Sequence, residues 1–372
     1  MPPRVVVASD SFKGSLTSVE VGAAVRSGLL DRRADTVVDV VPVADGGEGT
    51  VDAALAAGFR AVPAAVHGPT AEPVRTTLAE RDGVVVLELA DACGLGRLPG
   101  RTPRPLAASS RGLGEALRAA LDLAPRTMVV GVGGSASTDG GAGMLTALGA
   151  RVLDPSGAAV PEGGGDLGRA ATTDLTGLDP RLRGVRLVLA ADVRSPLLGP
   201  DGAAAVFGPQ KGATPDDVAV LEASLATWAG LLAPDLVGTP GAGAAGGVGF
   251  ALLALGAEHR SGVDVVLDLV GLDALLDGAD LVVTGEGWLD AQTSSGKAVT
   301  GVVRRATAAG VPVVAVCGRT TLTEDEVAGL GLAAAHPLTD LEPDPRRCVA
   351  EAADLLRAVG ARLAEERLSA PA

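Results

Sequence analysis

The chain has 372 residues, which is enough for two or three domains. Its formal net charge of -14 and its aromatic content of 2% argue against a nucleic-acid-binding protein, because such proteins usually present a basic face and stack bases on aromatic rings. The three cysteines and three histidines are scattered along the sequence, which argues against a disulfide framework and a structural zinc site.

Two strand–helix units are expected at the start of the chain. The apolar run at residues 4–8 predicts a strand, and the capping-box sequence from Thr17 to Glu20 predicts a helix over residues 18–31. A second strand is expected at residues 36–41, and a second helix at residues 49–57.

The same alternation returns near the end of the chain and adds three units. Strands are expected at 280–284, 311–316 and 332–335, and helices at 297–309, after a second capping box at Thr323, and at 346–366. Five such units predict an α/β fold with a flavodoxin-like, doubly wound parallel sheet domain. This domain would consist of residues 1–62 and 278–372.

The middle of the chain, residues 63–277, is expected to form a large inserted domain of mixed α/β type. Two strand-like runs flank Arg81-Asp82-Gly83, a hairpin signal that a purely parallel sheet does not need. Helices are expected at 110–121, 142–148 and 214–232, and buried strands at 127–132 and 186–191.

The sequence gives no sign of a membrane protein. Its longest uncharged stretch, residues 236–257, contains Pro240 and seven glycines, so a glycine-rich loop leading into a buried helix is the better interpretation. The N-terminus lacks the apolar run of a signal peptide. We expect a cytoplasmic protein, a monomer or homodimer, with neither a membrane nor a nucleic acid as partner.

Glycine-flanked polar residues follow four predicted strands of the first domain. In an open parallel sheet, ligands bind beyond the carboxyl ends of the strands. The four stretches are Ser9–Gly14, Ala44–Gly49, Gly285–Asp290 and Gly318–Arg319. Glycines admit phosphate oxygens, carboxylates hold Mg²⁺ or accept a proton, and cations stabilise a transferring phosphoryl group. Asp-Gly and Glu-Gly pairs also form simple turns, but four at one edge favour a site for phosphoryl transfer.

Similar loops occur in the predicted insertion. Residues 133–141 combine small hydrogen-bond donors with one carboxylate, Asp192 follows a predicted strand, and Lys211 lies in a Gly-Pro-Gln-Lys-Gly loop. The chain has only three lysines, Lys13, Lys211 and Lys297, and all three fall in such stretches. Because lysine is a compact charge that arginine replaces poorly, these three are candidates for binding phosphate.

Two stretches of the sequence resemble known phosphate-binding motifs, but neither fulfils all the requirements of its motif. Residues 295–298 resemble the end of a P-loop, yet Ala291 stands where the first glycine is needed and Ala298 lacks the metal-binding hydroxyl. Residues 241–246 match G-x-G-x-x-G, but they follow Thr239-Pro240 and not a predicted strand, so a dinucleotide site is not favoured.

Seven motifs in order resemble class I glycerate kinases, and the similarity extends from about Val5 to Gly318. They are ASDSFKGSLTSVE, PVADGGEGT, GVGGSASTDGGAGML, ADVRSPLLG, VFGPQKGA, PGAGAAGG and TGEGWLDAQTSSGK. Three residues depart from the family pattern: Thr138 and Ser195 stand where asparagine is usual, and Trp288 stands where arginine is usual. The last change removes a cation and leaves the donor or substrate preference open.

The resemblance implies transfer of the γ-phosphoryl group of ATP to a hydroxyl of D-glycerate, with Mg²⁺, in a cleft between two α/β domains. In most bacterial members the product is 2-phosphoglycerate, and 3-phosphoglycerate is the alternative. Two other classes stay open: a kinase for another small hydroxy acid, and a non-catalytic nucleotide or metabolite sensor.

Site roles are assigned from position and chemistry together with this resemblance. Asp192 is the first candidate, and Asp45 the second, for the base that orients the glycerate hydroxyl, with Lys13 as a further catalytic residue. The expected glycerate-binding residues are Asp10, Ser11, Glu48 and Arg319. The expected ligands of nucleotide phosphates are Gly133, Gly134, Ser135, Thr138, Asp139, Gly140, Gly141, Lys211 and Lys297. The expected Mg²⁺ ligands are Glu286 and Asp290.

Overall fold

The computed structural model describes residues 2–294 and 298–368, which form two compact units. Unit 1 contains the residues up to Asp45, Asp52–Ala57 and the residues from Val263 onward. Unit 2 contains Gly46–Val51 and Gly58–Gly262.

Unit 1 contains a five-stranded sheet in which all neighbouring strands are parallel. The strands lie in the order β13–β12–β11–β1–β2. Their bounds are β1 (Arg4–Ser9), β2 (Val37–Val40), β11 (Leu281–Leu289), β12 (Val313–Thr320) and β13 (Ala334–Pro337). Counted along unit 1, this order is 2-1-3-4-5, which is the flavodoxin-like arrangement. The predicted fold class is therefore confirmed, and the strand order reverses between β1 and β11.

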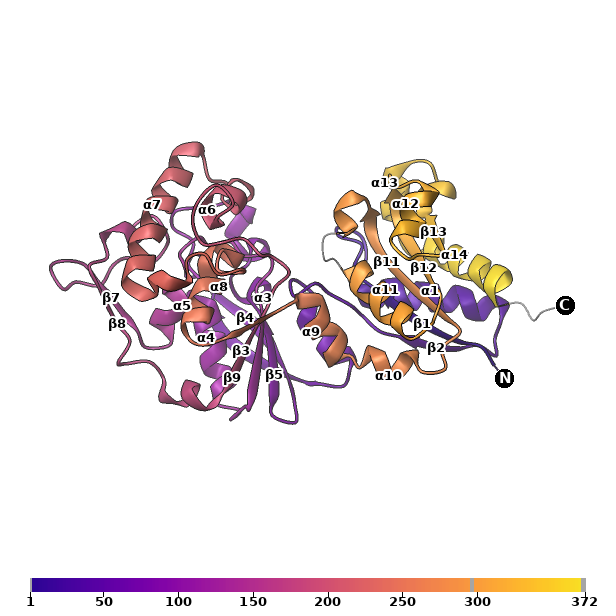
Figure 1. The fold of residues 1–372 in the computed structure, drawn as a ribbon, viewed down its shortest axis with the longest axis horizontal. Coiled ribbons are helices and arrows are strands. Elements are labelled where there is room, and N and C mark those ends of the chain that lie inside the picture. The colour runs from indigo at the N-terminus through magenta and orange to yellow at the C-terminus, as the bar shows by residue number, and fades with distance from the viewer. Residues whose placement is uncertain (1, 295–297, 369–372) are drawn as a thin grey trace. The chain divides into compact units, whose positions relative to one another are not determined.

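Helices cover both faces of this sheet (Figure 1). Their bounds are α1 (Ser18–Arg32), α2 (Thr50–Ala56), α9 (Gly262–Leu269), α10 (Leu272–Leu276), α11 (Ala298–Ala308), α12 (Glu324–Gly329), α13 (Pro345–Ala350) and α14 (Ala352–Arg367). Successive residues of β1 serve opposite faces: Val7 belongs to the core that includes Leu356 of α14, and Val6 to the core that includes Val302 of α11. This alternation is what a strand buried on both sides requires.

Helices α1 and α14 cross at two glycines. A Cβ on Gly28 would lie 1.9 Å from the carbonyl oxygen of Arg357, and one on Gly360 would lie 2.4 Å from the carbonyl oxygen of Val25. Either contact is far below van der Waals distance, so this close packing needs both glycines. The single helix expected at residues 346–366 is instead two helices, α13 and α14, separated at Glu351, whose φ of -108° and ψ of 16° are not helical.

Unit 2 contains a six-stranded mixed sheet in the order β10–β9–β6–β5–β4–β3. The bounds are β3 (Arg60–His67), β4 (Pro73–Arg81), β5 (Val84–Glu88), β6 (Thr127–Gly131), β9 (Arg186–Ala190) and β10 (Glu258–Arg260). Strands β3, β4 and β5 are antiparallel neighbours, and the pairs from β5 to β10 are parallel. The predicted hairpin is confirmed at the β4–β5 turn, where Asp82 and Gly83 both have positive φ. The sequence did not predict β3.

The other elements of unit 2 surround this sheet. Two short strands, β7 (Arg151–Leu153) and β8 (Thr172–Asp174), form a separate antiparallel pair. The helices are α3 (Leu89–Cys93), α4 (Arg111–Leu121), α5 (Ala142–Ala147), α6 (Ala203–Phe207), α7 (Pro215–Leu232) and α8 (Ala244–Ala254). Part of the stretch expected to be a glycine-rich loop already belongs to helix α8, in which Ala245, Gly246 and Gly247 have positive φ. None of the helices in the described residues combines the length and apolar character that a bilayer-spanning segment needs.

The division into units differs from the predicted domain boundaries at both ends of the insertion. Residues 60–62 were expected in the first domain, but they belong to β3 and pair with β4 in unit 2. Helices α9 and α10 lie in the range 63–277 that was expected to form the insertion, but the residues from Val263 onward group with unit 1. The physical reason is their packing, since Val266 and Leu272 lie in the same hydrophobic core as Val282 of β11.

Candidate active site

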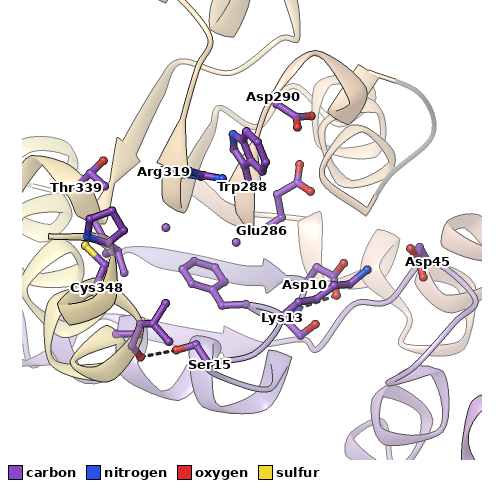
Figure 2. A pocket seen from close by; sticks show the side chains of 18 residues that line it. Asp10, Lys13, Ser15, Asp45, Glu286, Trp288, Asp290, Arg319, Thr339 and Cys348 are labelled. Carbon is purple, nitrogen blue, oxygen red and sulfur yellow. Dashed lines mark hydrogen bonds between the residues drawn. The ribbon is translucent and has the colours of Figure 1, made fainter. Parts of the chain in front are cut away.

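A cavity of about 680 Å³ lies in unit 1, where the loops after β1 and β2 meet the ends of β11 and β12. Its position is the switch point at which ligands bind in open α/β sheets. Figure 2 shows carboxylates and Lys13 on one side, and Thr339 and Cys348 on the other. The lining residues from the predicted site are Asp10, Ser11, Lys13, Asp45, Glu286, Asp290 and Arg319.

Asp10 follows the last residue of β1 and is fixed by its own turn. The amide of Ser11 donates to Asp10 Oδ1 at 2.6 Å. Burial, the nearby carboxylate of Asp45 and, more weakly, that of Glu286 raise the pKa of Asp10 to about 6, although Lys13 and the Ser11 amide oppose the shift. The carboxylates of Asp45 and Glu286 lie close enough to Asp10 to interact with it electrostatically. The predicted stretches after β1, after β2 and within β11 therefore converge at this site.

Glu286 is almost fully buried and is held by a residue that the sequence did not single out. Thr293 Oγ1 donates to Glu286 Oε1 at 2.5 Å. Thr293 Oγ1 also accepts a hydrogen bond from the amide of Asp290 at 3.1 Å. Thr293 itself is completely buried, in the turn Ala291–Ser294 that follows β11. One hydroxyl thus positions both candidate metal ligands. Its place, two residues before the stretch at 295–298 that resembles the end of a P-loop, was the only signal in the sequence.

Strand β11 continues past its predicted end at Thr284 as far as Leu289. The stretch Gly285–Asp290, expected to be a loop, therefore lies largely in the sheet, where Trp288 is the register partner of Arg319 on β12. The Arg319 guanidinium lies 3.7 Å from the centroid of the Trp288 ring. The glycines that suggested a turn instead let β11 and β12 approach closely: a Cβ on Gly285 would lie 2.2 Å from the carbonyl oxygen of Val316.

Asp192 and Glu48 both belong to unit 2 and do not line this cavity. Asp192 lies just beyond β9, as predicted, and its Oδ1 accepts from Ser261 Oγ at 2.7 Å and from the Gly262 amide at 3.0 Å. These two donors fix the orientation of the carboxylate. Glu48 is exposed in the glycine-rich turn before α2.

The loop at residues 133–141 is mostly interior to unit 2. Gly133 and Gly134 are reachable from solvent, whereas every residue from Ser135 to Gly141 is buried. Asp139 accepts from the amides of Ser110, Gly141 and Gly143, and also from the Ser110 hydroxyl. Burial raises the pKa of Asp139, and these donors oppose the shift.

The residues predicted to cradle nucleotide phosphates, Ser135, Thr138, Asp139, Gly140 and Gly141, are buried within unit 2. Gly140 uses both of its backbone polar groups within the fold: its amide donates to the carbonyl of Gly246, and its carbonyl accepts from Trp228 Nε1 at 2.9 Å. Backbone amides that bind the protein itself are not available to a ligand.

Lys211 also has an internal role. Its side chain is 2% exposed, and Nζ donates to Ser135 Oγ at 2.7 Å and to the carbonyl of Ser137 at 2.6 Å. Burial lowers the pKa of Lys211 to about 7, although the nearby Asp139 carboxylate opposes this. As placed, Lys211 stabilises the loop and does not reach a phosphate in solvent. The third lysine, Lys297, lies outside the described residues.

The carboxylates of unit 1 fit a divalent cation that is shared with a substrate. The described residues contain no cluster of three or more acidic, histidine or cysteine side chains suited to holding a metal by itself. Mg²⁺ in phosphoryl-transfer sites usually binds one or two carboxylates and completes its shell with water and phosphate oxygens. The raised pKa of Asp10 supports this fit, because a cation would relieve the repulsion among Asp10, Asp45 and Glu286.

Comparisons with known proteins all point to the same family. The sequence matches the glycerate kinase family over residues 5–367. It is 44% identical over 323 residues to the glycerate kinase of Bacillus subtilis (strain 168), covering 85% of each chain. It is 41% identical over 330 residues to the glycerate 2-kinase of Escherichia coli (strain K12), covering 87% of this chain and 86% of the relative. A solved structure from Salmonella typhimurium LT2, provisionally assigned as glycerate kinase 2, is similar with a TM-score of 0.85 and 38% identity, covering 98% of both chains.

Proposed function

The chain belongs to the glycerate kinase family, and we propose that it transfers the γ-phosphoryl group of ATP to a hydroxyl of D-glycerate, giving 2-phosphoglycerate. The observation that carries this proposal is the cavity at the β1/β11 switch point, where Asp10, Asp45, Glu286 and Asp290 lie with Lys13 in one pocket. Phosphoryl transfer is mainly positioning and electrostatic stabilisation, and these are the side chains it needs.

Glu286 and Asp290 would hold Mg²⁺, with Asp10 beside them. When bound, the cation would offset the negative charge of the phosphate oxygens. Thr293 fixes the Glu286 carboxylate and the Asp290 backbone through one hydroxyl, so these groups need little reorganisation when substrate arrives. Lys13 is exposed at the edge of the cavity, where its ammonium group can bind a phosphate oxygen or the glycerate carboxylate.

Asp192 is the proposed base. In the reaction, the glycerate hydroxyl oxygen attacks the γ-phosphorus in line with the leaving group, and the bond from that phosphorus to the bridging oxygen of ADP breaks. The hydroxyl proton passes to a carboxylate. Asp192 suits this task because the Ser261 hydroxyl and the Gly262 amide hold its carboxylate in one orientation. Asp45 is the second candidate for the same proton.

The test is an ADP-release assay with D-glycerate and Mg-ATP, followed by phosphorus NMR of the product. We expect ADP release that depends on D-glycerate, with the phosphoryl group on the C2 oxygen. A phosphoryl group on the C3 oxygen would overturn the assigned regiochemistry but not the kinase activity. Preference for another hydroxy acid in a substrate panel would overturn the acceptor, and ligand binding without ADP release would indicate a sensor.

A further inference from the structure

The unit 1 cavity is larger than a three-carbon acid needs. Its volume of about 680 Å³ is in the range of pockets that enclose drug-sized ligands, roughly 300–1,000 Å³. The carboxylates and Lys13 account for only one side of it (Figure 2). The remaining space leaves room for a second part of a ligand, whose chemistry can be read from the residues that line the cavity.

The other side of the cavity is mainly apolar. Beside the polar residues Ser15 and Thr339 it is lined by Phe12, Leu338, Pro345, Cys348, Val349 and Ala352. The wall is fixed in place, because Ser15 Oγ donates to the carbonyl of Val349 at 2.8 Å and Cys348 Sγ donates to the carbonyl of Glu342 at 2.9 Å. Such a wall suits a flat apolar group attached to a polar or charged one.

Two large apolar side chains remain unusually accessible at this cavity. Val349 is 54% exposed and Trp288 is 44% exposed, in a chain whose aromatic content is only 2%. Exposed apolar side chains that gather in a concavity mark a binding groove more often than an ordinary surface. The two residues come from α13 and β11, which are distant in sequence, so the fold brings them to one place.

Trp288 and Arg319 add a surface on which a base can stack. The guanidinium lies over the indole ring, 3.7 Å from its centroid, and both residues line the cavity (Figure 2). Aromatic rings and guanidinium planes are the groups on which nucleic acid bases stack in proteins. A purine nucleotide combines such a base with a polyphosphate, and these two parts match the two sides of the cavity.

The alternative position for a nucleotide, the loop at residues 133–141 of unit 2, is mostly buried. We propose that the unit 1 cavity is the nucleotide site: the purine base occupies the apolar side, bordered by Phe12 and the Trp288–Arg319 pair, and the polyphosphate extends toward Lys13 and Glu286. This inference rests on the proposed function for the identity of the phosphoryl donor. It assigns Trp288 to recognition of the base.

Intrinsic fluorescence tests the proposal without relying on activity. The chain has two tryptophans: Trp228 is completely buried in unit 2, so acrylamide quenching reports on the accessible Trp288. We expect ADP alone to protect Trp288 from acrylamide, whereas D-glycerate or inorganic triphosphate alone protects far less. A Trp288→Phe variant should lose the signal. Equal protection by inorganic triphosphate, or protection by D-glycerate and not by ADP, would overturn the proposal.

A matched pair of variants tests the apolar side. Val349→Trp fills the cavity beside the proposed base, and Val220→Trp places the same ring on α7 of unit 2, at a valine that is 43% exposed and does not line the cavity. Both sites are exposed, so the fold should persist. Because stacking of a base is worth about tenfold or more in affinity, we expect Val349→Trp to weaken ADP binding about tenfold and Val220→Trp to leave it unchanged. Equal effects in both variants would contradict the assignment.

The two proposals fail separately. If the wild-type enzyme phosphorylates D-glycerate but ADP does not protect Trp288, the nucleotide site is wrong and the proposed function stands. If ADP protects Trp288 and Val349→Trp weakens its binding, but no phosphoryl group reaches D-glycerate, the nucleotide site stands and the proposed function is wrong.

Discussion

The hydroxyl of Thr293 donates to Glu286 Oε1 at 2.5 Å while accepting the amide of Asp290 at 3.1 Å, so one buried oxygen orders both ends of the segment that carries the candidate metal ligands. Glu286 is in β11 and Asp290 follows directly after it. A side chain that fixes a ligand in this way influences metal affinity without touching the metal.

Replacing Thr293 with valine should therefore raise the Mg²⁺ concentration needed for half-maximal activity by about 10–100-fold, because the Glu286 carboxylate loses the hydrogen bond from the Thr293 hydroxyl. Thr293→Ser keeps the hydroxyl and should restore most of the wild-type requirement. The measurement is kcat against free Mg²⁺ at saturating D-glycerate. A merely structural role would lower stability in the valine variant but leave the Mg²⁺ requirement unchanged.

Lys13→Ala should lower kcat by about 10²–10³-fold while the fold is retained, the usual loss when one preorganised donor to a developing charge is removed. Lys13 is exposed at the cavity edge, so its loss leaves no buried hole. Arg26→Ala, which removes an exposed cation from α1 outside the lining of the cavity, is the matched control. Wild-type turnover in Lys13→Ala would remove this lysine from the site.

The variant Asp192→Asn separates two roles of Asp192: accepting a proton, and accepting the hydrogen bonds from Ser261 and Gly262. The amide retains an oxygen that can accept from Ser261 and Gly262, but it is a very poor base, so kcat should fall by about 10²–10⁴-fold. Ser261→Ala removes one donor to Asp192 and should cost about tenfold at most. If the two variants lose activity equally, Asp192 acts by holding the chain at Gly262, and Asp45 becomes the candidate base.

The ionised carboxylate of Asp10 should lower the free energy of unfolding at neutral pH. Its folded-state pKa of about 6 lies above the ordinary value of 3.8, so the folded state disfavours the ionised form. The carboxyl group of Asp10 does not lower the free energy of unfolding well below pH 3.8, where it is protonated in both states. The destabilisation grows as the pH rises above 3.8 and is complete once the pH has passed about 6. Asp10→Asn should therefore be more stable than the wild type by about 3 kcal/mol at pH 7.5 and by about 1 kcal/mol at pH 4.5. Urea unfolding in metal-free buffer measures the difference, and equal stabilities at pH 7.5 would show that the carboxylate is not strained.

Lys211→Met should destabilise unit 2 and spare the chemistry. The substitution leaves Ser135 Oγ and the Ser137 carbonyl without their donor, at a cost of about 1–3 kcal/mol. The KM for ATP of the folded variant should stay within about threefold of the wild-type value. An unchanged melting temperature together with a large rise in this KM would show instead that Lys211 binds the nucleotide.

The strand ends of unit 1 could be predicted because the strand and helix patterns are local. Once β1, β2, β11 and β12 are recognised, the rules of parallel sheets bring Asp10, Asp45, Glu286 and Arg319 to one edge. The extension of β11 to Leu289 could not be predicted in this way. It depends on pairing with β12, which is distant along the chain, and Gly285 and Gly287 locally favour a turn.

Burial was the main property that the sequence concealed. Residues 133–141 are small and polar, which suits a phosphate loop and a closely packed turn equally well. Only the tertiary structure shows that most of this loop is buried, with Trp228 donating to the carbonyl of Gly140 and Lys211 donating to the hydroxyl of Ser135. Thr293 was missed for a similar reason, since a threonine in a turn has no special signature until its partner Glu286 is known.

The pairing of β1 with β11 has a consequence for protein synthesis. Val5 pairs with Leu281, so β1, an interior strand of the unit 1 sheet, leaves the ribosome long before β11, its neighbour on one side, exists. The continuous stretch Gly58–Gly262 of unit 2 emerges in between and can fold as soon as it is complete. The β1–β2 segment must therefore wait for β11 with part of its apolar surface uncovered.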